Sequence, residues 1–187
     1  MKKIIASSAI LLFTFAILSV SASAQEEKGK RLSPPASADC TLAAGKTIHI
    51  DYSSPRMKGR EIYGGLVPWG QVWRTGANEA TTFVISADVT VGGKDVPAGS
   101  YTLFTIPNED KWTLIISKKT KRDNSDKPLW GIPYPGEQFE LTRADLQVSK
   151  LDSPVEDFRI AFDKTGSGCA LRMDWETTRA SIAISPK

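Results

Sequence analysis

The sequence predicts an all-β protein, an antiparallel β-sandwich or jelly roll of about nine strands with little helix. Apolar residues occupy every second position in a series of short segments, which is the period of a half-buried strand. Turns rich in Gly, Pro, Asn and Asp separate these segments at a spacing of roughly ten residues. Two packed sheets would bury the apolar faces of such strands.

The first predicted strand covers residues 47–52, where Ile48, Ile50 and Tyr52 share one face. A tight hairpin turn is predicted at Gly92 and Gly93. The only helical candidate is a single turn near 142–146, and the Pro-rich stretch 118–140 predicts a long loop. The same alternation predicts further strands near 82–86, 89–91, 101–106, 112–116, 146–148, 158–162, 169–175 and 180–184.

The N-terminus has the three parts of a secretory signal peptide. Lys2 and Lys3 precede an apolar run over residues 4–20, and small residues lead to a cleavage site after Ala24. The remaining length is typical of one domain with one core. We therefore expect a signal peptide at 1–24, an extended leader at 25–36 and a single β-sandwich domain at 37–187.

The predicted signal peptide indicates a secreted or periplasmic protein with no membrane association after cleavage. The formal net charge is +3, and Lys2 and Lys3 account for two of these charges, so residues 25–187 sum to about +1. Basic and acidic residues are interleaved along most of this part of the chain. The charge balance therefore does not indicate nucleic-acid binding, and no pattern indicates a cofactor.

The two cysteines, Cys40 and Cys169, are expected to form a disulfide because the chain is predicted to be exported. Such a bridge would tie the start of the domain to its end and contribute roughly 4 to 5 kcal/mol in the chain-entropy model. The alternative is a pair of buried free thiols. A catalytic thiol is disfavoured, since the chain has a single histidine to act as its base.

The stretch between Tyr52 and Phe83 differs from the rest of the chain, because it is dense in Gly, Pro, Arg and Trp. Such a composition excludes a helix and disfavours a regular strand. Binding and catalytic groups are over-represented on irregular backbone of this kind. The stretch therefore marks the place for a candidate site, without naming its chemistry; it reads YSSPRMKGREIYGGLVPWGQVWRTGANEATTF.

Within this stretch, WRTGANEAT brings Trp73, Arg74, Asn78 and Glu79 around one glycine. The planar guanidinium of Arg74, next to the ring of Trp73, could hold a carboxylate, a phosphate or a sugar. The alternative is a loop staple, in which Arg74 pairs with Glu79 and Asn78 bonds the turn backbone. The staple is the favoured interpretation, because charged groups removed from water are usually paired.

His49 and Asp51 share the polar face of the first predicted strand. One histidine cannot make a typical zinc site, and the two cysteines are expected to pair with each other, so no metal site is predicted. Glu79 with Asp51 or Glu61 could form a carboxylate pair for glycoside hydrolysis, provided that the two groups face one groove. The sequence does not decide whether the protein is an enzyme.

The irregular stretches also carry aromatic residues, namely Tyr63, Trp69 and Trp73 in one and Trp130 and Tyr134 in another. Exposed rings on stiff backbone stack on sugars or pack on peptides, whereas buried rings would close the ends of a sandwich. Two or more of these rings, each more than about a third exposed around one concavity, would favour binding. The remaining tryptophans on regular strands, 112 and 175, are assigned to the core.

Three runs, YSSPRMKGR, IYGGLVPWGQVWRTGANEATTF and PAGSYTLFTIP, closely resemble DUF2911, a family of bacterial exported proteins of unknown function. The resemblance continues through VEDFRIAFDK and LRMDWETTRASIAI and covers nearly all of the chain beyond the leader. It implies a single secreted β-rich domain. It supplies no reaction, ligand or catalytic residue.

Three hypotheses follow from these patterns. The first is a non-enzymatic binding or envelope-associated module for a small molecule, glycan or peptide, with Arg74 as anchor and Trp69 or Trp73 as platform. The second is a secreted glycan or ester hydrolase that uses Glu79 with Asp51 or His49. The third is a purely structural interaction domain. Ligand identity and oligomeric state do not follow from the sequence.

Overall fold

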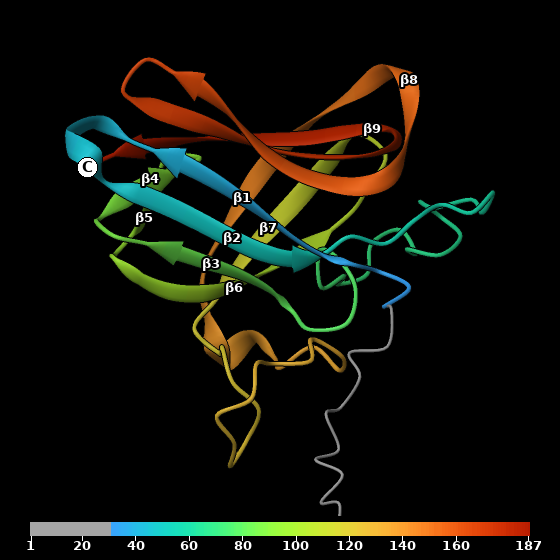
Figure 1. The fold of residues 1–187 in the computed structure, drawn as a ribbon, viewed down its shortest axis with the longest axis horizontal. Helices are drawn as coiled ribbons and strands as arrows, with labels where there is room; N and C mark the ends of the chain where they lie inside the picture. The colour runs from blue at the N-terminus through green and yellow to red at the C-terminus, as the bar shows by residue number, and fades with distance from the viewer. Residues whose placement is uncertain (1–30) are drawn as a thin grey trace, which may run out of the picture. The chain divides into compact units, whose positions relative to one another are not determined.

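The computed structural model describes residues 31–187, which fold into one antiparallel sheet (Figure 1). The predicted signal peptide and residues 25–30 of the predicted leader lie outside the described residues. The sheet has nine strands in the order β1-β2-β3-β6-β7-β8-β9-β4-β5. The strands are β1 (Pro35–Thr41), β2 (Thr47–Ser53), β3 (Thr81–Ile85), β4 (Val89–Val91), β5 (Lys94–Val96), β6 (Gly99–Ile106), β7 (Lys111–Ser117), β8 (Glu140–Thr165) and β9 (Gly168–Pro186).

The antiparallel all-β fold predicted from the sequence is confirmed. Helix in the described part is limited to the short 3-10 turns η1 (Ala43–Gly45) and η2 (Glu137–Phe139). Burial alternates along β2, where Ile48 and Ile50 are fully buried between exposed or half-buried neighbours. The Gly92–Gly93 hairpin is present as the turn between β4 and β5, and both glycines adopt positive φ.

The last two strands differ from the prediction in their continuity. The sequence predicts four short strands between residues 146 and 184, whereas β8 and β9 each run continuously through two of them. Register shifts near Lys150 and Val155 bend the pair without ending it. Such bends let one continuous sheet supply both faces of the core.

Residues 142–146 form strand and not the predicted helical turn. Ala144 and Leu146 are buried at alternate positions and pair with β7, opposite Leu114 and Trp112. Burial of every second side chain is the pattern of a strand with one covered face. Packing against β7 therefore overrides the weak helix-capping pattern at residue 142.

The sheet folds back so that β1, at one edge, contacts β8 (Figure 1). Pro35 and Ala36, assigned to the leader from sequence, already pair with Ser53 and Tyr52 of β2. Cys40 in β1 and Cys169 in β9 form a disulfide with a Cα–Cα distance of 6.7 Å. The predicted pairing is therefore present, and it joins strands far apart in sheet order.

The core fills the space inside the folded sheet. Its largest fully buried side chains include Trp112, Trp175, Phe83 and Phe158, so both strand tryptophans lie in the core as predicted. A second, smaller cluster around Phe104 and Ile115 lies on the other face of β6 and β7. Leu129 and Tyr134 cover that cluster, because the loop between β7 and η2 packs across it.

Candidate functional site

The segment between β2 and β3, residues 54–80, is irregular but closely anchored. Trp73 exchanges two backbone hydrogen bonds with Thr105 of β6, at 2.7 and 2.9 Å. The Ala77 N–H donates to the Ser53 carbonyl at 3.1 Å, and the Ala80 N–H to the Leu129 carbonyl at 2.8 Å. The segment is therefore tied to the sheet on one side and to the long loop on the other.

Gly76 fixes the turn that follows Trp73. Its φ is +153°, and a Cβ at this position would lie 2.9 Å from the Ser53 carbonyl oxygen. The preceding Thr75 is buried with φ at +56°, and its carbonyl accepts a 2.6 Å hydrogen bond from the Thr81 hydroxyl. The Trp73 indole N–H also donates to the Gly76 carbonyl, at 3.1 Å. These bonds hold the backbone around Arg74 in one conformation.

The ion pair expected between Arg74 and Glu79 is not formed. Glu79 instead accepts hydrogen bonds from Arg31, at 2.7 and 3.1 Å. This pairing lowers the pKa of Glu79 and keeps the carboxylate ionised. The short sequence separation favoured Arg74 as the partner of Glu79. In the structure the partner is Arg31, which precedes β1 in the chain and lies beside the same turn. Asn78 follows its prediction in part, because its amide bonds a backbone carbonyl, that of Ser33, at 3.2 Å.

Arg74 lies in a cleft of about 340 Å³, here called the Arg74 cleft. Its Nε is buried without a hydrogen-bond partner, and no carboxylate of residues 31–187 lies within 4.0 Å of its guanidinium. Burial lowers the pKa of Arg74, although an arginine stays protonated at neutral pH. The cleft is lined by Ser33, Pro55, Arg60, Leu66, Val67, Trp73, Arg74, Gly76, Ala77, Ile132 and Trp175.

The long loop shapes one wall of this cleft. Gly131 has φ at +81°, and a Cβ there would lie 2.9 Å from Arg74 Cβ and 3.2 Å from its Cδ. The loop backbone therefore packs directly on the aliphatic part of Arg74. Ile132, the next residue, lines the cleft and is 61% exposed.

The aromatic residues of the segment pack largely against the core. Trp73 stacks on Trp175 with ring centroids 5.9 Å apart, and Tyr63 is buried against Trp112. Trp69 stacks on Tyr63 and stays 37% exposed, outside the lining of the Arg74 cleft. Trp130 is 42% exposed beside Arg122 and does not line this cleft either. The two exposed rings thus do not flank the Arg74 cleft.

His49 and Asp51 lie away from Arg74, on the outer face of β2. The His49 ring contacts Asp39 through Nδ1 at 2.6 Å and Asp51 through Nε2 at 3.1 Å. The hydrogen bond with Asp39 raises the pKa of His49. Asp51 and Glu79 line a separate, mostly apolar depression together with Arg31 and Tyr52. Among residues 31–187, no group of three or more His, Cys, Asp or Glu is placed to hold a metal ion.

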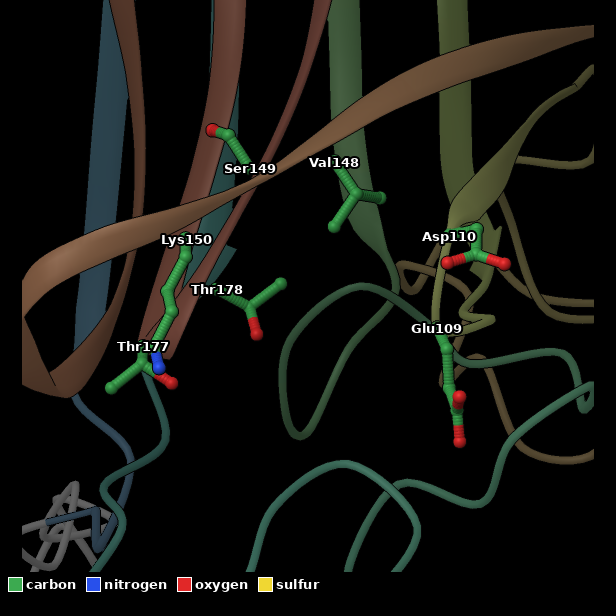
Figure 2. A pocket seen from close by; sticks show the side chains of 7 residues that line it. All are labelled: Glu109, Asp110, Val148, Ser149, Lys150, Thr177 and Thr178. Carbon is green, nitrogen blue, oxygen red and sulfur yellow. The ribbon is translucent and has the colours of Figure 1, made fainter.

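Another depression, of about 350 Å³, contains none of the residues selected from the sequence (Figure 2). Glu109 and Asp110 enter it from the turn before β7, whereas the other side chains come from β8 and β9. In Figure 2 the Lys150 side chain extends toward Thr177 and away from the two carboxylates. The depression has no buried unpaired polar atom, so it provides no comparable anchor.

Sequence reasoning missed several residues of the Arg74 cleft. Arg60, Leu66 and Val67 fall inside the stretch selected for its composition, but nothing in the pattern distinguishes them from their neighbours. Ile132 comes from the Pro-rich loop and Trp175 from β9, and only the tertiary fold brings these to Arg74.

These observations define a class of protein, an antiparallel single-sheet β fold in which the irregular connection between β2 and β3 supplies most of a cationic cleft. The chain belongs to a family of proteins of unknown function, DUF2911, whose family model matches residues 33–184. No curated protein and no solved structure matches this chain. None of the helices within 31–187 has the length and apolar character needed to cross a bilayer.

Proposed function

We propose that this protein binds a small amphipathic anion, with Arg74 as the anchor of its charged group. The observation that carries the proposal is the half-buried guanidinium of Arg74, whose buried Nε has no hydrogen-bond partner. No carboxylate of the described residues lies within 4.0 Å of it, and only the more distant charge of Glu79 attracts it. A charged group that loses water without gaining a partner is costly, so such groups are normally paired. A bound anion would supply the missing partner.

The chemistry of the cleft favours an anion over other ligands. Its lining contains two arginines, Arg60 and Arg74, and no acidic side chain. The planar fork of an arginine matches the geometry of a carboxylate, which can accept two parallel hydrogen bonds. We therefore take a carboxylate as the charged group of the ligand.

The remaining lining favours an apolar body on the same ligand. Leu66 and Ile132 both line the cleft and are 46% and 61% exposed. Such aliphatic side chains gain from contact with an acyl chain or an apolar side chain. The exposed tryptophans lie outside the cleft lining, so stacking on a sugar ring receives less support than aliphatic contact.

The same proposal places binding outside the cytoplasm. The predicted signal peptide and the Cys40–Cys169 disulfide support it, because disulfides persist in oxidising compartments. The hydrolase hypothesis receives less support, since both Glu79 carboxylate oxygens already accept hydrogen bonds from Arg31.

The test is titration of the protein with decanoate, followed by calorimetry and by tryptophan fluorescence, since Trp73 and Trp175 line the cleft. Decanoate should bind, and the uncharged 1-decanol should bind more weakly. Arg74→Met should weaken decanoate binding about 10- to 100-fold, because a hydrogen bond to a charged group is worth about 1.5 to 3 kcal/mol.

Lys94→Met is the matched control. Lys94 is exposed on β5 and also has no carboxylate within 4.0 Å among residues 31–187, so its loss removes one positive charge away from the cleft. Decanoate affinity should be unchanged in this variant. Equal affinity of wild type and Arg74→Met, or no binding by the wild type, would contradict the proposal.

A further inference from the structure

A second depression adjoins the Arg74 cleft. It has a volume of about 320 Å³, is lined by Leu32, Ser33, Arg56, Lys58 and Arg60, and is here called the basic depression. Ser33 and Arg60 line both cavities. These two residues therefore form a wall that the two cavities have in common.

The combined lining of the two cavities is strongly cationic. It contains Arg56, Lys58, Arg60 and Arg74 and no acidic residue. Arg56 pairs with Asp157 at 2.9 Å, whereas the other three have no carboxylate within 4.0 Å among the described residues. These three positive charges on adjoining cavities repel one another, and the distant charge of Glu79 offsets this only for Arg74, so a bound anion would be favoured here.

The cations of the basic depression lie on a hydrogen-bonded turn, residues 56–60. The Arg60 guanidinium donates to the Met57 carbonyl at 2.9 Å and to the Arg56 carbonyl at 2.6 Å, through Nε and Nη2. Its Nη1 takes part in neither bond and remains a donor.

The same turn is fastened to β8. The Met57 N–H donates to the Glu156 carbonyl at 2.9 Å, and the Lys58 N–H donates to the Glu156 carboxylate at 2.9 Å. That carboxylate is bound to the backbone and does not pair with the Lys58 ammonium. The turn backbone and the Arg60 guanidinium are therefore held in place before any ligand arrives, which lowers the entropy cost of binding.

We infer that the ligand is an elongated dianion, with one anionic group on Arg74, a second in the basic depression and an apolar body between them. This inference rests on the proposed function, since Arg74 anchors the first group. A monoanion would leave Lys58 and Arg60 uncompensated. The apolar part of the ligand would lie along the aliphatic wall formed by Leu66 and Ile132.

Paired probes of equal chain length test the inference. Octanedioate, decanedioate and dodecanedioate are compared with octanoate, decanoate and dodecanoate in calorimetric titrations. One dicarboxylate should bind about two- to fivefold more tightly than its monocarboxylate, which is the gain expected from one partly exposed ion pair. The advantage should be largest at one chain length, because the backbones that carry Arg74 and Lys58 are both held by hydrogen bonds.

Charge reversal at Lys58 identifies the second anchor. Lys58→Glu should abolish the advantage of the dicarboxylate and weaken monocarboxylate binding by a smaller factor, since Lys58 lies outside the Arg74 cleft lining. Lys94→Glu makes the same charge change on β5 and should preserve the advantage. Thermal unfolding of both variants controls for loss of fold.

The outcomes separate the two proposals. If neither series binds, the proposed function itself is wrong. If both series bind through Arg74 with equal affinity, the second anchor is wrong and the proposed function stands. A dicarboxylate advantage that has no chain-length optimum, or that survives Lys58→Glu, also overturns the inference, because it would reflect general attraction to a basic surface.

Discussion

Glu79 forms a two-point ion pair with Arg31, whereas Arg74 in the same turn has no carboxylate within 4.0 Å among residues 31–187. The two charged residues of WRTGANEAT thus have different surroundings. Glu79 joins the turn to the chain that precedes β1, and Arg74 lies in a cleft. The turn backbone has a structural role, and the Arg74 side chain that it carries is available to a ligand.

This difference predicts opposite effects of two substitutions on stability. Glu79→Gln should lower the melting temperature slightly, because it breaks the pair with Arg31. Arg74→Met should leave the free energy of unfolding unchanged within about 0.5 kcal/mol or raise it, because it removes an unpaired charge and keeps apolar contacts. Chemical denaturation of both variants measures these changes.

The salt dependence of stability provides a control for the two variants Glu79→Gln and Arg74→Met. The cost of Glu79→Gln should shrink in about 1 M NaCl, where an exposed ion pair is screened. The effect of Arg74→Met should not shrink in parallel. A clear loss of stability in Arg74→Met would show that Arg74 has a structural partner and would count against an open anion site.

The carboxylate of Asp174 should be a main polar determinant of stability. Asp174 is 4% exposed in its side chain and pairs with Arg172 and, at 2.7 and 2.8 Å, with Arg179. Removing one partner from a buried ion pair leaves the other charges uncompensated. Asp174→Ala should therefore cost about 3 kcal/mol, the low end of the usual range, since both arginines retain contact with water. Urea denaturation measures the loss.

Asp163→Ala is the matched comparison for that variant. Asp163 also pairs with Arg172, at 3.1 Å, but its side chain is 57% exposed. Such a pair contributes about 0 to 1 kcal/mol. Similar costs for the two substitutions would refute the view that burial makes Asp174 the centre of this network.

The disulfide should contribute strongly to folding. Cys40 and Cys169 are separated by 129 positions, so the bridge restricts most of the chain in the unfolded state. The double variant Cys40→Ala/Cys169→Ala should lose about 4 to 5 kcal/mol in the chain-entropy model. Both sulfurs are buried, so the comparison requires a second measurement that does not change packing.

Reduction supplies that measurement. Dithiothreitol should destabilise the wild type toward the level of the double variant and should not affect the double variant itself. A wild type that keeps its full stability after complete reduction, verified by thiol titration, would show that packing and not the cross-link accounts for the effect.

The sequence predicts the strands well because a buried face imposes a period of two on residues such as Ile48, Ile50 and Phe83. It cannot show that β8 and β9 are each continuous. Their bends near Lys150 and Val155 depend on register with a distant strand, which leaves no local pattern.

The site is harder to predict for a related reason. Composition identifies the stretch that contains Arg74, but contacts across the fold determine which charges pair. Arg31 reaches Glu79 from before β1, and Ile132 and Trp175 complete the cleft from the loop and from β9. Short-range spacing favoured an Arg74–Glu79 pair because it takes no account of these partners.

His49 predicts a dependence of stability on pH. Its ring lies between Asp39 and Asp51, and the hydrogen bond with Asp39 raises its pKa in the folded state above the ordinary value near 6.5. Protonation therefore favours folding. The stabilisation should be complete below about pH 6.5 and should disappear as the pH rises through the higher folded pKa.

His49→Gln should consequently reduce stability at about pH 5.5 and should have little effect at about pH 9. Urea denaturation at both values measures the difference between wild type and variant. The difference should be small at either pH, because the ring is 40% exposed and solvent screens its charge. Asp39→Asn should weaken the same pH dependence, since Asp39 makes the largest contribution to the raised pKa. If the gap between wild type and His49→Gln is equal at the two pH values, the histidine contributes through packing and not through its charge.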